Sequence, residues 1–326
     1  MLNSRRPLLV LCALVVCAML VLLLAVFCGS SGCTRALLED PMYLSLRLPR
    51  ATSAFIVGGL LALAGALMQV LLRNPLADPY VLGLSGGAAA GALSALLVAG
   101  HLGWLGDGVA ALGAALGSGV AVLLLFGLAG QALYRFSAGP HAYRLILTGV
   151  MIAAGFGAIV TLVLTLAPDA QLRGMFFWLM GDLEDSRWLL PAAVLLVLIL
   201  VWSMWHAQQL NLLARGADSA QLLGVPVRRL RVSTLCAASL ASAAAVTVAG
   251  TIGFIGLVVP HAMRLLFGNE QRLLLPASVL VGGASLALAD LVARTLFAPT
   301  QLPVGVITAL IGVPVFLWVL SRSNTA

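Results

Sequence analysis

Long apolar runs separated by short polar clusters set the pattern along this chain. A helix needs roughly 20 apolar residues to cross the hydrocarbon core of a bilayer. The pattern therefore predicts an all-α polytopic membrane protein with about ten transmembrane helices. An even number of spans places both termini on the same side of the membrane. The expected spans are residues 7–28, 51–72, 82–102, 108–130, 144–167, 189–207, 230–250, 253–267, 274–297 and 303–321.

The composition agrees with a chain that lies almost wholly in lipid. Of its 326 residues, 62% are hydrophobic and only 9% are charged, which leaves no room for a large soluble domain. We therefore expect a single transmembrane domain over residues 1–326. Continuous apolar runs argue against a barrel, because barrel strands alternate lipid-facing and lumen-facing residues. The 34 glycines suit close packing between membrane helices.

The basic charge reflects membrane topology. The net charge of +7 is carried by arginine, since the sequence has no lysine. Twelve of the 18 arginines fall on the same side of the expected spans as the N-terminus. Cytoplasmic loops carry an excess of positive residues, so this bias predicts that both termini are cytoplasmic. The arginines are scattered between spans and do not gather in one patch, so nucleic acid is not an expected partner.

The five cysteines show no metal-ligand spacing, and no metal site is predicted. Cys28 and Cys33 flank a short Gly/Ser segment and could pair if that segment is extracytoplasmic. Free cysteines in apolar surroundings are the alternative, because a sequence alone does not determine a pairing.

Arg47-Leu48-Pro49-Arg50 lies at the outer end of the second expected span, where proline suits the first turn of a helix. Two arginines on this side oppose the topological bias, so we expect a cationic patch for an acidic partner or an anionic ligand. Simple interfacial anchoring is the alternative. Arg294 could join the patch from the ninth span, or it could form an intrahelical ion pair with Asp290, four residues earlier.

The longest segment between spans on the N-terminal side covers residues 208–231. Within it, residues 217–226 have the composition of a short helix, and Gly224 and Pro226 would end that helix. A short capped helix outside the bilayer is a feature that a soluble partner could grip. A plain loop is the alternative.

A short apolar segment, residues 173–181, lies on the opposite side after the fifth span. It is too short to cross a bilayer and too apolar for a free loop. We expect a re-entrant or interfacial helix at the outer vestibule, with Arg173 facing the translocation pathway. An interfacial aromatic belt is the alternative.

Two other function classes match parts of the sequence. Gly83-Leu84-Ser85-Gly86 fits the Gly-x-Ser-Gly pattern of intramembrane serine proteases, which need a histidine base such as His261 near the serine. An ion-coupled secondary transporter usually needs buried carboxylates. Asp290 is the only acid within an expected span, and Arg294 can neutralise it.

The interruptions together resemble the FecCD family, the permease subunits of ATP-binding-cassette (ABC) importers for iron chelates, haem and cobalamin. The resemblance covers about residues 47–321, nearly the whole chain. The segments that carry it are Arg47–Arg50, Gln69–Pro79 with Gly83–Ser85, Ala217–Val225, Gly250–His261, Leu274–Pro276, Ala289–Asp290 with Arg294, and Leu302–Gly305.

The resemblance implies a type II, cobalamin-permease-like architecture of ten helices in the bacterial cytoplasmic membrane. It implies a homodimer with the pathway on the dimer axis and two cytoplasmic ATPase subunits. An extracytoplasmic, periplasmic-type binding protein would deliver the substrate, a metal chelate such as a ferric siderophore, haem or cobalamin. Membrane lipid is the remaining expected partner.

Family roles transfer to positions that match its motifs. Arg47, Arg50 and Arg294 fall where the family presents arginines to acidic residues of the binding protein. The inner gate falls near His141 and Ala142, where the cobalamin permease has small hydroxyl residues. The helix that docks into the ATPase is matched by Ala217, Asp218, Ser219, Ala220, Gln221, Leu222, Leu223 and Gly224.

The chain has no Gly-x-x-x-x-Gly-Lys-[Ser/Thr] loop, and without lysine it cannot build one. We therefore expect no catalytic residues and no bound cofactor, with ATP acting through a partner subunit. Closure of that partner would push on the helix at residues 217–225. The ATPase partner would bind the inward-open and outward-open states of the permease with different affinities, and this difference would drive alternating access.

Overall fold

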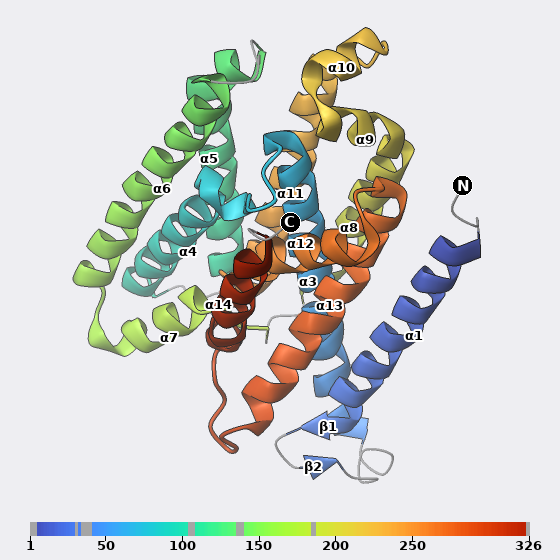
Figure 1. Ribbon diagram of the computed structural model, residues 1–326. Coiled ribbons are helices and arrows are strands. Elements are labelled where there is room, and N and C mark those ends of the chain that lie inside the picture. Colours follow the sequence, from blue (N-terminus) through green and yellow to red (C-terminus); the bar gives the residue numbers. More distant parts are fainter. Residues whose placement is uncertain are drawn as a thin grey trace.

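The computed structural model describes residues 5–29, 32–33, 41–103, 108–134, 140–183 and 187–323. The described chain is almost entirely helical (Figure 1). Two short strands, β1 (Cys28–Gly29) and β2 (Gly32–Cys33), form an antiparallel pair after the first helix. The helices of the first half are α1 (Arg5–Phe27), α3 (Pro41–Leu72), the 3-10 turn η1 (Pro79–Leu82), α4 (Leu84–His101), α5 (Val109–Tyr134) and α6 (Pro140–Leu166).

The second half mixes long helices with short ones. The short helices lie where the sequence analysis expected segments outside the bilayer, on either side of α8. The helices are α7 (Asp169–Leu179), α8 (Leu189–Trp205), α9 (Ala207–Arg215), α10 (Ala217–Leu222), α11 (Val227–Ala249), α12 (Ile255–Phe267), α13 (Gln271–Thr295) and α14 (Val304–Ser323).

Helix α3 runs through the centre of the bundle and packs against α8, α11, α12 and α13. Figure 1 shows α4, α5 and α6 on one side of this centre and α1 on the other. Small residues allow the central helices to approach closely. A side chain at Gly65 would overlap the carbonyl of Gly256 on α12, and one at Gly58 would overlap the carbonyl of Gly282 on α13.

The structure contains a helix at each of the ten expected spans. Seven of the described helices are long and apolar enough to cross a membrane, or eight if α8 and α9, bent by 66°, are one span. Helix α12 and the described apolar part of α14 (Val304–Trp318) are shorter. The membrane-spanning, all-helical class is therefore confirmed, while a count of ten crossings stays a prediction.

The start of the second span is a correction. We expected a helix from about residue 51 with proline in its first turn, but α3 begins at Pro41 and continues through Pro49. At 1.5 Å per residue this 32-residue helix is about 48 Å long, well beyond the hydrocarbon core. The additional turns lie at the end of the bundle that carries β1 and β2, where apolar residues such as Leu46 and Leu48 are exposed.

Backbone breaks separate the elements where the sequence has glycine and proline. The Asp78 carboxylate accepts a hydrogen bond from the Tyr80 backbone N–H (2.7 Å) and caps η1. Gly83 then takes a left-handed conformation (φ 82°) that opens α4. Gly250 (φ 66°) and Phe254 (φ 70°) divide α11 from α12, so these are two helices and not one long helix.

The two ends of the bundle differ (Figure 1). The hairpin end carries β1, β2 and α7, and the α10 end carries α9 and α10 together with the start of α1. At the hairpin end Cys28 is disulfide-bonded, and the strand register places it directly opposite Cys33. The two cysteines whose pairing the sequence did not determine therefore lie opposite each other in the β1–β2 hairpin.

Candidate functional site

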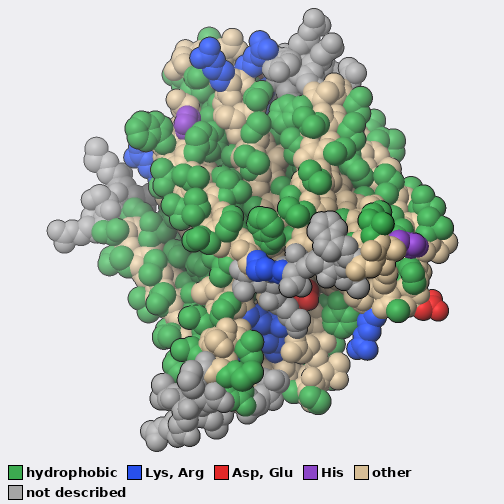
Figure 2. Space-filling model, turned by 180° about the vertical axis from the view of Figure 1, so that it is seen from behind, with side chains coloured by type: hydrophobic (Ala, Val, Ile, Leu, Met, Phe, Trp, Pro, Cys, Tyr) green, Lys and Arg blue, Asp and Glu red, His purple; other side chains and the backbone are tan. Residues whose placement is uncertain are grey.

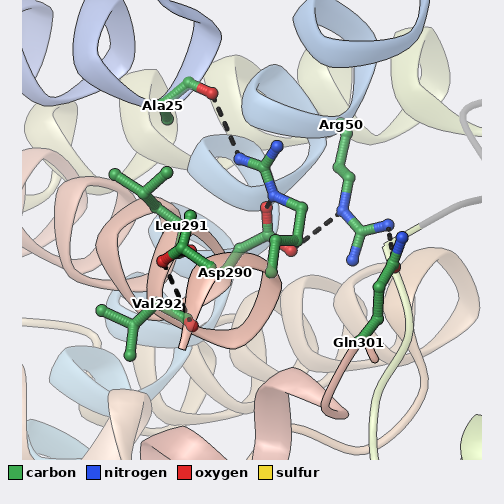
Figure 3. A network of polar contacts seen from close by, with 8 residues as sticks. Ala25, Arg50, Asp290, Leu291, Val292 and Gln301 are labelled. Atoms are coloured by element: carbon green, nitrogen blue, oxygen red, sulfur yellow. Dashed lines mark hydrogen bonds and ion pairs between the residues drawn. The ribbon is translucent and has the colours of Figure 1, made fainter. Parts of the chain in front are cut away.

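The predicted arginine patch at the hairpin end is built around one buried acid. Asp290 of α13 has no exposed surface. Its Oδ1 accepts the Nε–H of Arg50 at 3.0 Å, and its Oδ2 pairs with Arg294 Nε at 2.9 Å (Figure 3). Both carboxylate oxygens are thus used by arginines. The intrahelical pair of Asp290 with Arg294 that we considered from the sequence is confirmed.

Further hydrogen bonds join this cluster to other elements. Arg294 donates to the Ala25 carbonyl of α1 (3.1 Å), and Arg50 donates to the Gln301 side chain (3.1 Å), as Figure 3 shows. Arg47 donates to the Phe27 carbonyl (3.2 Å). The cluster therefore connects α1, α3, α13 and the segment after α13.

The structure brings the three predicted arginines together, but it buries most of their surface. Arg47 and Arg294 are buried, and Arg47 also lies over the Tyr43 ring at 5.5 Å. Only the Arg50 side chain, 15% exposed, reaches the surface appreciably. Arg50 and Arg294 share the Asp290 carboxylate, and Arg47 joins the same end of the bundle through the Phe27 carbonyl.

Sequence reasoning identified the arginines but missed the hub role of Asp290 and the contribution of Gln301. The available signal for Asp290 was its position as a lone acid in an apolar helix, because such a residue is expected to be paired. No local signal pointed to Gln301, which lies 251 residues from Arg50.

The α10 end presents a different surface. The predicted short helix is present as α10, and it ends before Gly224, whose φ of 80° suits glycine. Ala220 packs inward, whereas Leu222 and Leu223 are 89% and 66% exposed. Apolar side chains so exposed on a short helix are typical of a contact surface.

Beneath α10 lies a polar cavity of about 200 Å³. Arg73, Arg215 and the buried Arg231 line it together with Asp218 and Ser219. Arg73 donates to the Arg215 carbonyl (3.4 Å) from a left-handed backbone conformation (φ 49°). This cavity was not identified from the sequence, because its arginines come from three different segments.

The residues expected along the pathway are Arg173, His141 and Ala142. Arg173 is exposed on α7, where it lies over the Phe177 ring at 5.8 Å, while Met175 anchors the helix. A helix is therefore present over most of the expected segment, while its position at the membrane interface stays a prediction. His141 and Ala142 lie in the first turn of α6, and their side chains are outside the described part of the chain.

The protease interpretation lacks its central contact. His261 is buried in α12, and within the described residues neither ring nitrogen has a hydrogen-bond partner, so His261 does not hydrogen-bond to Ser85. Nor do the described residues include a group of three or more His, Cys, Asp or Glu that could hold a metal ion.

Comparison with known proteins identifies the class. The model of the FecCD transport family matches residues 8–322. The ABC transporter permease YvrB of Bacillus subtilis (strain 168) is 41% identical over 298 residues, covering 88% of this chain and 81% of that protein. The hemin transport system permease HmuU of Yersinia pestis is 40% identical, covering 87% and 84%. The vitamin B12 import permease BtuC of Vibrio vulnificus (strain CMCP6) is 39% identical, covering 88% and 85%.

A solved structure agrees with these relatives. A metal-chelate type ABC transporter in an inward-facing conformation superposes with a TM-score of 0.85 at 28% identity, covering 96% of this chain and 99% of that chain. The ATPase activity of such transporters lies in a separate subunit. The chain therefore belongs to the FecCD transport family and is the permease subunit of an ABC importer, a multi-pass protein of the bacterial cytoplasmic membrane.

Proposed function

We propose that this permease moves a metal chelate inward as a homodimer with two cytoplasmic ATPase subunits and an extracytoplasmic binding protein. The named relatives support the substrate class, since they transport hemin and vitamin B12 and the structural neighbour is of the metal-chelate type. Relatives with different substrates are almost equally identical to this chain, so we assign the class and not one chelate.

We assign the α10 end to the cytoplasm and the hairpin end to the outside. The arginine bias supports this orientation, because cytoplasmic segments carry the excess of positive residues. The disulfide at Cys28 supports it independently, since disulfides persist in oxidising compartments. Both termini are then cytoplasmic.

The observation that carries the proposal is the exposure of Leu222 and Leu223 on α10. Two leucines held in water at the cytoplasmic end lose favourable burial energy unless a soluble partner covers them. We assign residues 217–224 as the surface that inserts into the ATPase. ATP-driven movement of the ATPase would then push α9 and α11 through the chain connections on either side of α10.

The test is the double variant Leu222→Asp/Leu223→Asp, purified together with the cognate ATPase. We expect association to weaken by at least about 1,000-fold, because burying the two leucines is worth about 4 kcal/mol together and a buried carboxylate adds a further penalty. The control is the single variant Leu102→Asp, which puts one carboxylate on an exposed leucine after α4, at the hairpin end. Unchanged association of the α10 variant would contradict the assignment.

Proteoliposomes separate this function from ion-coupled transport. We expect chelate accumulation only when the ATPase, ATP and the binding protein are present. Accumulation by the permease alone under a proton gradient would overturn the proposal. The structure supports the importer, because Asp290 is held by two arginines and is poorly suited to carry a proton or cation.

At the outer end we assign Arg47, Arg50 and Arg294 to the docking of the binding protein. Guanidinium groups gathered at one end of the bundle attract acidic side chains and favour rapid association. Arg50 is the residue best placed for direct contact, since its side chain is the most exposed of the three. His141, Ala142 and Arg173 remain our candidates for the pathway and its inner gate.

A further inference from the structure

An apolar groove runs between α5, α8 and α11, away from both docking ends. Its volume is about 620 Å³, and its lining includes Gly119, Trp188, Leu195 and Ala243, almost all apolar. Small residues on α5 and α11 form the floor, so the helix surfaces do not fill the space themselves. An apolar groove of this kind in a membrane-spanning protein is suited to bind a hydrocarbon chain.

A second groove of about 740 Å³ continues the first along α8 and α11. The two share Cys236 and Leu240, so they form one trough along α11. From Arg228 to Val248 the trough follows 20 residues of helix, about 30 Å, which matches the thickness of the hydrocarbon core.

The trough ends in positive charge at the α10 end. Arg228 and Arg229 line the second groove and are exposed in the first turn of α11. Cations at a helix N-terminus oppose the helix dipole, so this placement does not stabilise the helix by itself. An anion there would be attracted by both the guanidinium groups and the helix end. Figure 2 shows the surrounding face, with basic side chains at its upper edge above a broad apolar band.

We propose that this trough binds an anionic phospholipid, with the phosphate at Arg228 and Arg229 and one acyl chain along α11 past Cys236. Basic pockets between membrane helices on the cytoplasmic side suit anionic head groups. The assignment to the cytoplasmic leaflet depends on the proposed orientation, but the site does not. A protein partner fits less well, because it would have to place an acidic group at one end of a trough that is otherwise lined mostly by apolar side chains.

The head-group part is tested by titrating phosphatidylglycerol and phosphatidylcholine into purified full-length permease and counting bound lipids by native mass spectrometry. We expect Arg228→Gln/Arg229→Gln to bind phosphatidylglycerol about 25-fold more weakly, since each arginine near the head group contributes about fivefold. The control, Arg73→Gln/Arg215→Gln, removes the same charge from the cavity under α10 and should bind normally. Equal binding of the two lipids by the unaltered permease would overturn the proposal.

The acyl-chain part is tested by filling the groove. A Cβ added at Gly119, or at Gly155 on α6, meets no atom within 4 Å, so both positions open onto free space, but only Gly119 lines the groove. We expect Gly119→Leu to weaken binding roughly tenfold, the equivalent of about two displaced methylene groups, and Gly155→Leu to leave it unchanged.

A measurement without substitutions completes the test. Phosphatidylglycerol should slow alkylation of Cys236, followed by peptide mass spectrometry, and phosphatidylcholine should not. If protection of Cys236 increases with permease concentration and does not depend on lipid, a second copy of the permease covers the trough. That result would overturn the proposal. None of these readouts involves transport, so they fail independently of the proposed function.

Discussion

The two ends of the bundle reverse the usual rule of burial. The hairpin end buries charged side chains, and the α10 end exposes apolar ones. At the hairpin end, arginines turn inward onto buried Asp290 and connect helices that are far apart in sequence. At the α10 end, Leu222 and Leu223 project from a short helix into solvent. The hairpin end thus uses its arginine cluster within its own structure, whereas the α10 end exposes two leucines that the proposed ATPase contact would cover.

This difference suggests how the two docking surfaces tolerate change. Substitutions in the arginine cluster should affect folding before they affect docking, because each arginine serves a buried acid or carbonyl. Substitutions on α10 should affect docking and leave folding nearly unchanged. Three variants test this contrast, and their expected effects decrease from the first to the last.

The largest effect is expected from Asp290→Asn. The change leaves two arginines without their shared carboxylate in a buried site, and breaking such a pair costs about 3–5 kcal/mol. Thermal unfolding in detergent should show a large fall in the melting temperature. Asp218→Asn, on exposed α10, is the matched control and should change stability by less than about 0.5 kcal/mol. Equal melting temperatures for the two variants would show that the buried cluster contributes no more to stability than exposed α10 does.

A smaller effect is expected from Arg50→Gln, measured as binding-protein association by biolayer interferometry. Because the Arg50 guanidinium is partly exposed, we expect its loss to slow association by roughly tenfold and to weaken the salt dependence of association. Arg47→Gln removes the same charge from a buried position and should act mainly on stability. If Arg47→Gln alone slowed association, the assignment of Arg50 as the contact residue would be wrong.

The smallest effect is expected at Asp78, a half-buried acid whose cap is a backbone amide and not an arginine. Burial raises the pKa of Asp78, and the hydrogen bond from Tyr80 opposes that rise only in part. A raised folded-state pKa stabilises the protein below the ordinary value near 3.8, and this contribution is lost as pH rises through the raised pKa.

Asp78→Asn keeps an oxygen for the Tyr80 amide and removes this titration. Unfolding temperatures of the two proteins between about pH 4 and pH 8 should therefore diverge as pH rises, with the Asn variant becoming relatively more stable. Parallel curves would show that the fold does not perturb the Asp78 carboxyl.

Much of the architecture could be predicted from hydrophobic runs and breaks. Those runs located all ten main helices, and Gly224 with Pro226 located α10. The start of α3 was misjudged because Pro49 suggested a helix start, although a long membrane helix tolerates proline within it. The arginines were recognised as a set, but their burial was not foreseen.

By itself, the sequence determined the helical membrane class, the order of helices and breaks, and the family. These properties follow from local hydropathy, from turn residues and from motifs that are short in sequence. Only the tertiary structure decided that Arg50 meets Asp290 across 240 residues, that Cys28 lies opposite Cys33 in a strand pair, and that α5, α8 and α11 leave a trough ending at two arginines. The physical reason is that packing and ion pairing depend on which helix faces meet, and hydropathy alone does not specify the partners of a face.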